Sequence, residues 1–590
     1  MPVNSFKDDE QSIEASKLKT LVRLLSYLAV YKKEILLVLL IMAFCVAVSL
    51  LNPLIMETAI DVYISAENWD GLLHLTGFAL ILNVIMTGAM KVRMYIMAKV
   101  CNSILVTIRQ ELYTHIQVLD FQFFDSRPTG KILARIIGDI NSLKDVLSNC
   151  VTTLIPDFIT ICAVAIIMFV KNPILAAASL SSTPVMAICL WLIQIYSHKR
   201  WQIHRKKASN LNAFVHEDFS GIRIIQSFHA QDETKRTFHE LVKEHHDSFV
   251  SAVRLNDAFG SVIDFCWGIG TVMLYFTGIL ILGPDKVSIG TFIAFGTYIS
   301  MFWHPIMNLS NFYNQLITNI SGAERVFEIM DAEAEIKDAQ DAIPIPPIMG
   351  KICFDHVAFS YDGDINILDG ISFTVMPGET IALVGPTGAG KTTIVNLISR
   401  FYDVQQGAVL VDGYNVKKVS IESLRSQMGI MTQDNFLFSG TIKENIRYGR
   451  LDASDEEIIQ AAKAVNAHDF IMKLEKGYGT ELSERGGGLS AGQKQLLAFA
   501  RTMVSDPRIL ILDEATSSID TKTELLVQAG IETLLNGRTS FVVAHRLSTI
   551  QKADRIFYID NGKIVEQGSP RELMKIKGAY YQLYMSQFHC

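Results

Sequence analysis

The sequence carries little charge for its length and has no excess of basic residues. Only 19% of its 590 residues are charged, and the formal net charge is -7 at pH 7. Nucleic-acid-binding proteins usually present a basic surface, so this balance argues against a nucleic-acid partner. Apolar residues make up 49% of the chain and the mean hydropathy is +0.27, which is high for a soluble enzyme and indicates contact with a lipid bilayer.

Paired cysteines and a cleavable leader are also lacking. The spacing of the eight cysteines contains no CxxC pair and no metal-ligand pattern, which disfavours both disulfides and a zinc site. The cysteines are Cys45, Cys101, Cys150, Cys162, Cys189, Cys266, Cys353 and Cys590. Residues 1–33 are mostly polar and do not show the basic, apolar and small-residue order of a secretory signal peptide. We therefore expect the N-terminus to stay in the cytoplasm.

Six long apolar runs predict membrane-spanning helices. They cover residues 35–51, 72–90, 151–170, 174–195, 259–282 and 289–309. Three alternate connections hold 24 lysines and arginines, and the other three hold 2. Because positive loops stay inside, this asymmetry predicts a multi-pass protein of the cytoplasmic membrane with both termini cytoplasmic. The long cytoplasmic connections are amphipathic, so we expect the spans to continue as helices beyond the bilayer.

The composition changes after Met330. Residues 331–349 are acidic and contain prolines, which is typical of a linker. Beyond them, strand-like runs such as "TIALVG", "RILILDE" and "TSFVVAH" alternate with helical runs and predict an α/β domain with a largely parallel sheet. The predicted domains are an N-terminal cytoplasmic segment (1–33), a transmembrane domain with six helices (34–330), a linker (331–349) and an α/β P-loop nucleotide-binding domain (350–590).

A phosphate-binding loop follows one of these strands. Residues 385–392, "GPTGAGKT", fit the pattern G-x-x-x-x-G-K-[ST] between a strand and a helix. Backbone N–H groups of such a loop hold phosphate oxygens, Lys391 adds charge at the β and γ phosphates, and the Thr392 hydroxyl can bind Mg²⁺. The predicted phosphate-binding residues are Gly385, Pro386, Thr387, Gly388, Ala389, Gly390, Lys391, Thr392 and Thr393.

A pair of acids ends the strand "RILILDE". This strand delivers Asp513 to its carboxyl end, where Mg²⁺ would lie, and Glu514 comes next. A carboxylate beside the metal could orient or deprotonate the attacking water in phosphoryl transfer. The alternative is an exposed pair of acids at a strand end with no catalytic role.

Several motifs together resemble an ABC transporter half of the bacterial exporter type. They are "GPTGAGKTT", Gln433 in "MTQD", "LSAGQ", "LILDEATSSID" and His545 in "VVAHRLST", and they follow the six apolar runs. The resemblance covers essentially the whole chain and implies an ATP hydrolase coupled to transport. It also implies that two nucleotide domains pair head to tail. The glycine-rich stretch "SERGGGLSAGQ" would then place Ser490, Gly492 and Gln493 on ATP held by a partner.

The resemblance assigns further roles one residue at a time. Tyr361 in "FSYDG" would stack on adenine, although a tyrosine packed on the sheet is the alternative. Gln433 would join Mg²⁺ and the attacking water, His545 would contact the γ-phosphate, and Asp520 would lie in the loop that crosses to the partner. The implied catalytic residues are therefore Glu514, His545, Gln433 and Lys391, and the implied Mg²⁺ ligands are Thr392, Gln433 and Asp513.

One position departs from the family pattern. The family has LSGGQ, and this chain has Ala491 at the third position. With Glu514 present, the chain is most similar to the catalytically competent subunit of heterodimeric multidrug exporters, and a homodimer remains the alternative. The implied function is ATP-driven export of amphiphilic small molecules. A lipid or peptide exporter, an importer and an ATP-gated channel or regulator are the alternatives.

Two cytoplasmic stretches resemble the short helices that couple the membrane and nucleotide domains of this family. They are residues 123–136, "FFDSRPTGKILARI", and residues 219–228, "FSGIRIIQSF". Their alternative role is simple loop capping.

Four ionisable residues fall at membrane depth, namely Lys91, Arg93, Asp157 and Asp264. Their ordinary role would be pairing between helices or reaching the headgroups. The sharper hypothesis is that Asp157 or Asp264 faces a cavity that favours cationic amphiphiles. Candidate cavity residues are Trp267, Trp303, Phe302, Phe312 and Met301.

Overall fold

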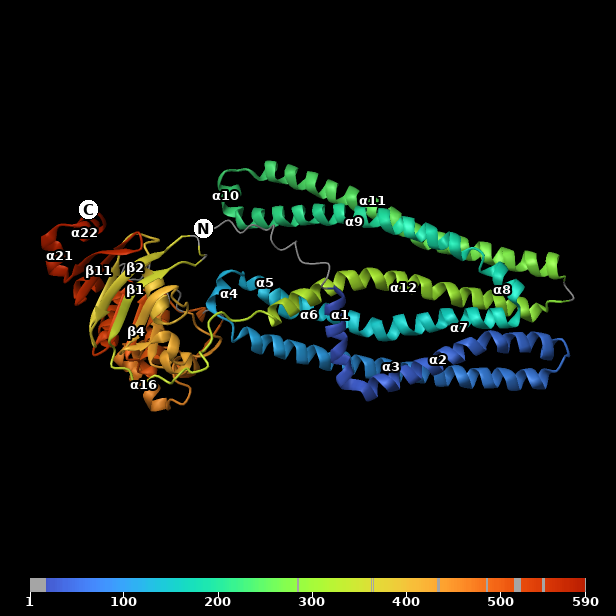
Figure 1. The fold of residues 1–590 in the computed structure, drawn as a ribbon, viewed down its shortest axis with the longest axis horizontal. Coiled ribbons are helices and arrows are strands. Elements are labelled where there is room, and N and C mark those ends of the chain that lie inside the picture. The colour runs from blue at the N-terminus through green and yellow to red at the C-terminus, as the bar shows by residue number, and fades with distance from the viewer. Residues whose placement is uncertain are drawn as a thin grey trace. The chain divides into compact units, whose positions relative to one another are not determined.

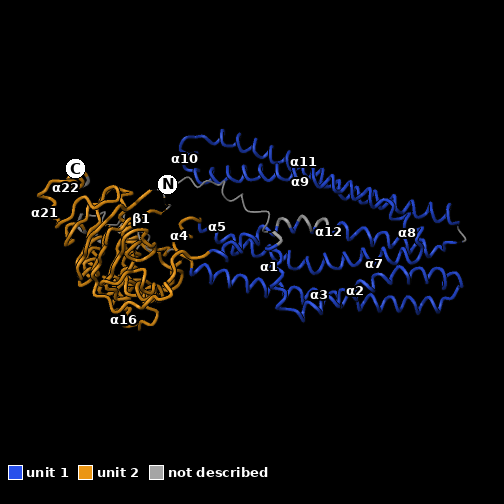
Figure 2. The backbone as a smooth tube through the Cα atoms, viewed as in Figure 1, with its two compact units in different colours: residues 1–118, 128–332 blue, residues 119–127, 333–590 orange. Residues whose placement is uncertain are grey.

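The computed structural model describes residues 17–283, 286–361, 363, 365–431, 436–483, 486–513, 521–543 and 547–588. Backbone contacts divide the chain into two compact units (Figure 2). One contains residues 1–118 and 128–332, and the other contains residues 119–127 and 333–590. The short segment 119–127 therefore belongs with the second unit, although its chain neighbours on both sides belong to the first.

The described residues of the first unit form helices joined by turns, without a strand (Figure 1). Its α-helices are α1 (Lys17–Ser26), α2 (Lys32–Thr58), α3 (Trp69–Ile116), α5 (Thr129–Ala134), α6 (Ile140–Asn149), α7 (Ile155–Lys171), α8 (Pro173–Ser179), α9 (Thr183–Ser220), α10 (Ile222–Ser227), α11 (Gln231–Phe276) and α12 (Ile289–Met330). Short turns of other helix types join them, namely η2 (Tyr27–Tyr31), η3 (Ala59–Ile64), η4 (Arg135–Asp139), η5 (Cys150–Leu154) and η6 (Thr277–Leu282).

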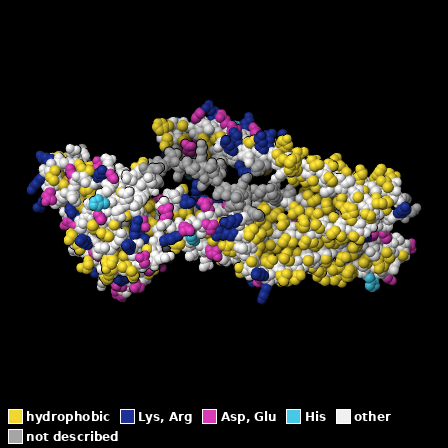
Figure 3. All heavy atoms as spheres, in the orientation of Figure 1, with side chains coloured by type: hydrophobic (Ala, Val, Ile, Leu, Met, Phe, Trp, Pro, Cys, Tyr) yellow, Lys and Arg dark blue, Asp and Glu magenta, His cyan; other side chains and the backbone are white. Residues whose placement is uncertain are grey.

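Five helical stretches among the described residues are long and apolar enough to cross a membrane. They are Lys19–Ile64, Trp69–Ile116, Thr129–Lys171, Pro173–Ser220 and Gln231–Leu282, and they contain the first five expected spans. The sixth expected span lies in α12, which is a continuous helix but is not among these five. Large apolar side chains cover much of the exterior of this unit in the view of Figure 3, as lipid contact requires.

The long helices extend well past a bilayer. The 48 residues of α3 make a helix of roughly 72 Å, against about 30 Å for the hydrocarbon core. Helices α9 and α11 lie side by side along their length, and the short α10 joins them at one end (Figure 1). These helices therefore carry large surfaces outside the apolar layer.

The second unit is an α/β domain. Its strands are β1 (Ile352–Phe359), β2 (Leu368–Val375), β3 (Thr380–Val384), β4 (Gln406–Val411), β5 (Tyr414–Asn415), β6 (Met428–Met431), β7 (Gly440–Thr441), β8 (Glu481–Leu482), β9 (Ile509–Asp513), β10 (Thr539–Val543), β11 (Arg555–Asp560) and β12 (Lys563–Gly568). Its helices are α4 (Phe121–Asp125), α13 (Lys391–Ile398), α14 (Ile421–Arg425), α15 (Ile442–Arg447), α16 (Asp455–Ala464), α17 (His468–Met472), α18 (Ala491–Ser505), α19 (Thr521–Leu535), α20 (Leu547–Lys552), α21 (Pro570–Ile576) and α22 (Ala579–Phe588), with turns η7 (Val416–Lys418) and η8 (Gly477–Gly479).

The expected parallel sheet is confirmed. In the described part of the domain, six strands take the order β12-β11-β3-β10-β9-β6, and only β12 pairs antiparallel. Alternate residues of β3 face opposite sides, so Ile381 and Leu383 enter one core while Ala382 and Val384 enter the other. The core that contains Ile381 and Leu383 also contains residues of α13 and of the second sheet, β2-β1-β4-β5. The core that contains Ala382 and Val384 also contains residues of α18.

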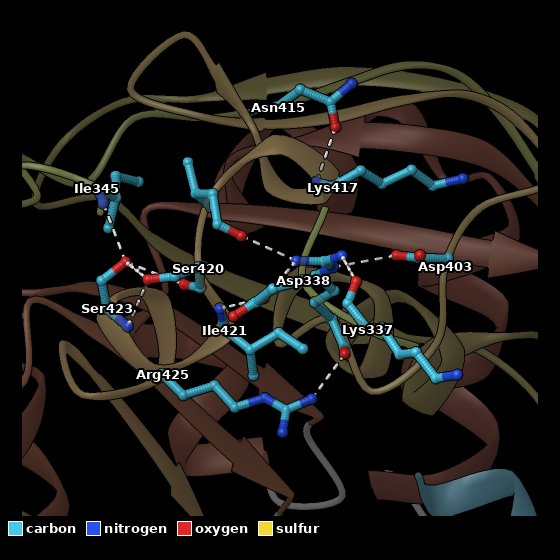
Figure 4. A network of polar contacts seen from close by, with 12 residues as sticks. Lys337, Asp338, Ile345, Asp403, Asn415, Lys417, Ser420, Ile421, Ser423 and Arg425 are labelled. Carbon is cyan, nitrogen blue, oxygen red and sulfur yellow. Dashed lines mark hydrogen bonds and ion pairs between the residues drawn. The ribbon is translucent and has the colours of Figure 1, made fainter. Parts of the chain in front are cut away.

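The acidic segment before this domain packs on it through a buried arginine. The side chain of Arg400 is 2% exposed, and its Nη2 donates to the backbone oxygen of Lys337 at 3.0 Å. Asp338 Oδ1 lies 3.5 Å from Arg400 Nη1 and accepts from the backbone N of Ile421 at 2.9 Å (Figure 4). Since a buried guanidinium requires carboxylate and carbonyl partners, Asp338 and the Lys337 carbonyl have a structural role.

Candidate functional site

Three parallel strands end together at one edge of the six-stranded sheet. The register aligns Val543 of β10 with Leu383 of β3 and with Asp513 of β9. The loop that begins at Gly385 therefore follows β3 close to the carboxylate that ends β9. In open parallel sheets, ligands bind at the carboxyl ends of the strands.

The loop between β3 and α13 depends on glycine backbone conformations. Gly385 has φ +148°, and a Cβ there would lie 2.0 Å from the carbonyl oxygen of Ile559. Gly388 has φ +84°, and a Cβ there would meet nothing within 4 Å. The first glycine thus allows the loop to pack against β11, and the second keeps the space above the loop open. The first N–H groups of α13 lack helical partners, which suits them to bind an anion.

Lys391 begins α13 and is buried within this loop. It is 8% exposed, and its Nζ donates to the carbonyl oxygens of Gly385 at 2.8 Å and Pro386 at 2.7 Å. Burial lowers the pKa of Lys391, and the negative charge of Asp513 opposes that shift. A buried ammonium held mainly by neutral carbonyls is stabilised by an added anion, so this cradle fits a phosphate group.

The other residues of the predicted phosphate-binding loop differ in their exposure to solvent. Pro386, Thr387, Gly388 and Thr392 are exposed. Ala389, Gly390 and Thr393 are buried. The exposed hydroxyl of Thr392 and the strand-end carboxylate of Asp513 provide oxygen ligands of the kind that Mg²⁺ prefers.

Tyr361 lies beside the helix that follows the loop. Its hydroxyl is 3.2 Å from Thr393 Oγ1, and its ring meets those of Phe359 and Tyr402 edge to face, each at 4.9 Å between centroids. These contacts fix the ring while leaving the residue 36% exposed. An exposed, oriented aromatic face next to a phosphate loop can stack on a base.

The signature residues lie elsewhere in the domain. Ser490 caps α18, where its hydroxyl accepts from the Gln493 backbone N at 3.3 Å and Gln493 Oε1 accepts from the Ser490 backbone N at 2.9 Å. Gly492 is buried, and Ala491 is exposed. Because α18 and α13 pack in the cores on opposite faces of the sheet, the structure brings Lys391, Asp513 and Tyr361 to one region but places the signature helix in another.

Four predicted residues lie outside the described residues, namely Gln433, Glu514, Asp520 and His545. The strands that precede three of them are described. Strands β6, β9 and β10 end at Met431, Asp513 and Val543, and all three run parallel to β3.

The sequence analysis expected residues 123–136 to couple the two domains but did not predict their contacts. The structure places residues 119–127 in the second unit, where α4 contacts residues around Tyr361, and residues 128–136 in the first. The Phe121 and Phe401 ring centroids are 4.3 Å apart, and the Tyr402 hydroxyl donates to Asp125. Burial and this hydrogen bond to an acid raise the pKa of Tyr402. The motif that could have indicated the contact is "FQFFD", in which aromatic residues precede an acid in a cytoplasmic loop.

The ionisable residues at membrane depth differ in their surroundings. Asp157 is hydrogen-bonded to Asn308 of α12. Asp264 lines a cavity together with the predicted residues Trp267 and Trp303. Phe302 and Phe312 are 7% and 5% exposed and are not among the residues that line this cavity.

Comparison with known proteins agrees with this organisation. Residues 35–306 match the family described as ABC transporter transmembrane region, and residues 368–517 match the family described as ABC transporter. The chain is 42% identical over 568 residues to the uncharacterized ABC transporter ATP-binding protein YknV of Bacillus subtilis, covering 96% of this chain and 94% of that protein. It is 37% identical over 573 residues to a putative multidrug export ATP-binding/permease protein of Staphylococcus aureus, covering 96% and 99%.

One solved structure extends the comparison to the fold. It is the structure of a bacterial Atm1-family ABC exporter with ATP bound, which superposes with a TM-score of 0.79 at 27% identity. The match covers 95% of this chain and 99% of that one. The helical unit and the α/β unit are thus found together in a known exporter.

Proposed function

The chain belongs to the ABC transporter family, and from this premise we propose that it exports amphiphilic small molecules across the cytoplasmic membrane. It is an exporter half in which a membrane region is fused to a domain that binds and hydrolyses ATP, and hydrolysis is coupled to transport. The proposed cargo has the support of the name of the Staphylococcus aureus relative and of the cavity described below.

The contact between α4 and Tyr402 carries the coupling part of the proposal, because it joins the loop between α3 and α5 to residues beside the proposed nucleotide site. Tyr402 touches the ring of Tyr361, which we assign to adenine, and its hydroxyl donates to Asp125. A change in ATP occupancy therefore has a direct route to α4, which the chain connects to α3 and α5.

The chemistry is assigned to residues at the carboxyl edge of the sheet. The loop from Gly385 and Lys391 would hold the phosphates, and one set of side chains would hold Mg²⁺ and the water. That set is Thr392, Asp513, Gln433, Glu514 and His545. Mg²⁺ would supply charge neutralisation on the β and γ phosphates. Glu514 would orient the water, and His545 would contact the γ-phosphate.

A second chain would complete each ATP site. Ser490, Gly492 and Gln493 would contact ATP held by the partner, with Asp520 in the crossing loop. The opposite cores occupied by α13 and α18 favour this arrangement over a site within one chain. Ala491, in place of the usual glycine, favours a heterodimer, and a homodimer is the alternative.

An exposed apolar tip supports the same assembly. Phe219, Ile224 and Phe228 around α10 are 71%, 64% and 79% exposed. Aromatic and aliphatic side chains at the end of a long cytoplasmic helix pair are suited to bury against another protein. We assign this tip to the nucleotide-binding domain of the partner.

The test uses the full chain purified with its natural partner and reconstituted in vesicles. One subunit band after co-purification would indicate a homodimer, and two bands would indicate a heterodimer. Wild type is expected to release phosphate and to move a fluorescent amphiphile in the presence of Mg-ATP, and Glu514→Gln is expected to lose both. Glu456→Gln, at an exposed position of α16, is the matched control and should keep both.

Two results would overturn the proposal. Phosphate release by Glu514→Gln at the wild-type rate would show that Glu514 is not required for ATP hydrolysis. Movement of the amphiphile with a non-hydrolysable ATP analogue, at the rate seen with ATP, would favour an ATP-gated channel over a pump.

A further inference from the structure

A small cavity lies between α11 and α12 within the membrane unit. Its volume is about 170 Å³, and the residues that line it include Asp264, Trp267, Ser300, Trp303, His304 and Met307. Counted at about 1.5 Å per residue from Leu282 and Ile289, the ends we assign to the outside, Asp264 and His304 lie roughly 20 to 30 Å deep. The cavity is therefore at the level of the inner leaflet.

Asp264 is a carboxylate without a protein partner at this depth. In the part of the chain that the structure describes, neither a hydrogen bond nor an ion pair reaches it. Asp157, at a similar depth, is hydrogen-bonded to Asn308, has a buried Oδ2 without a partner among the described residues, and is not among the residues that line this cavity. Ionisable residues in membrane spans are costly and usually serve a binding or transport role. An unpaired acid beside a cavity thus indicates a cationic ligand.

Two indole rings line the same cavity. Trp267 is 42% exposed, whereas Trp303 is 3% exposed. The Trp303 Nε1–H is buried and makes no hydrogen bond among the described residues. Tryptophan faces attract organic cations most strongly among aromatic side chains.

The volume limits what the cavity can hold. Sites that enclose a drug-sized molecule usually measure about 300 to 1,000 Å³. A cavity of about 170 Å³ is too small for a whole amphiphile but has room for a methylated ammonium group. An anionic head group of the same size would meet the like charge of Asp264, so charge selects the cation.

We propose that this cavity is a subsite for the head group of cationic amphiphiles, with Asp264 as counter-ion and Trp267 and Trp303 as aromatic walls. The apolar tail would lie outside the cavity. This inference rests on the proposed export of amphiphiles and narrows its cargo to compounds with a permanent or protonated ammonium group. His304 also lines the cavity, and an imidazole nitrogen that carries no proton can accept a hydrogen bond from a protonated amine.

The test measures binding without ATP, so that it does not depend on transport. The complete transporter in lipid nanodiscs is equilibrated with radiolabelled dodecyltrimethylammonium or with dodecyldimethylamine N-oxide, which is similar in shape but neutral overall. Binding to empty nanodiscs is subtracted. Asp264→Asn is expected to weaken binding of the trimethylammonium compound about tenfold and to change that of the N-oxide less than twofold.

Two variants sharpen the result. Asp157→Asn removes an acid of similar depth outside the cavity and should leave both affinities unchanged. Trp267→Leu keeps the carboxylate of Asp264 and should weaken binding of the cation several-fold. This variant still tests the subsite if Asp264→Asn fails to assemble.

Binding of the cation within twofold of wild type in both Asp264→Asn and Trp267→Leu would overturn the subsite. Equal loss of both compounds in Asp264→Asn would also overturn it, because charge would not be recognised. Failure of the proposed export is a separate result, since it would appear as absent ATP-driven transport while cation binding remained.

Discussion

Removal of the Asp125 carboxylate should weaken the coupling between ATP turnover and transport. Helix α4 is flanked in the chain by α3 and α5 of the membrane unit, yet it packs within the ATP-binding unit. Two contacts hold it there. Phe121 lies against Phe401 at 4.3 Å between ring centroids, and Asp125 accepts a hydrogen bond from Tyr402.

The magnitude follows from these two contacts. An aromatic pair contributes about 0.5–1.5 kcal/mol. A hydrogen bond to a charged group contributes about 1.5–3 kcal/mol, and we take about 1–2 kcal/mol here because Asp125 is exposed to water. Together they favour the docked form of α4 by about 1.5–3.5 kcal/mol, or roughly 10- to 400-fold. Asp125→Ala removes the larger part and leaves the Tyr402 hydroxyl, in a residue 6% exposed, without its acceptor.

We therefore expect Asp125→Ala to lower the docked-to-undocked ratio by about tenfold. In vesicles, ATP turnover without cargo should stay near that of wild type, because the phosphate site is intact. Transport per ATP hydrolysed should fall several-fold. Asp125→Asn can still accept a hydrogen bond and should retain most of the coupling. Gln122→Ala, at an exposed position of the same helix, is the matched control.

A double-mutant cycle of Asp125→Ala and Tyr402→Phe tests whether the hydrogen bond between these residues contributes to coupling. Because the two variants remove one shared hydrogen bond, their combination should cost little more than either alone. Fully additive losses of coupling would refute the role of this bond. So would wild-type coupling in Asp125→Ala.

Three further predictions concern the ATP-binding domain. Lys391→Met should raise the thermal stability of the protein without nucleotide by about 1 kcal/mol, because it replaces a buried charge, and it should abolish the rise in Tm that ATP gives the wild type. Gly385→Ala should destabilise the folded state by more than about 3 kcal/mol, since its Cβ would lie 2.0 Å from the Ile559 oxygen. Gly388→Ala should cost only about 1 kcal/mol, because its Cβ would meet nothing within 4 Å. Thermal unfolding of the two variants measures the difference. Ser490→Ala should destabilise the folded state by about 1 kcal/mol in a homodimer or a heterodimer, because the cap of α18 is lost. If Ser490 also contacts ATP held by the partner, ATP turnover should fall further than in a variant that is equally destabilised elsewhere.

The sequence predicted those parts of the site that depend on residues close together in the chain. The loop from Gly385 to Lys391 needs glycine conformations and a helix start at fixed spacing, so its motif is readable without a structure. The apolar strand that ends at Asp513 is likewise local, and β9 occupies the expected residues. The roles of Gln433, Glu514 and His545 remain predictions.

Contacts between distant segments were not predictable in the same way. The coupling role expected for residues 123–136 includes Asp125, but it did not identify the partner Tyr402, which lies 277 positions away in the chain. The acidic segment after Met330 was interpreted from composition as a linker. The structure gives one of its acids a role, because Asp338 and the Lys337 carbonyl lie against the buried guanidinium of Arg400.

The sixth expected span has a weaker apolar signal than the other five. Helix α12 begins with the expected apolar run but is interrupted by Ser300, Trp303, His304 and Pro305, and it is not among the five helices apolar enough to cross a bilayer by composition. Three of these four residues line the cavity that holds Asp264. A helix that faces lipid all round is free to be uniformly apolar, whereas a helix that contributes to a binding site must carry polar side chains at membrane depth. The polar residues that lower the hydropathy of α12 thus include three that lie beside Asp264 in the proposed subsite.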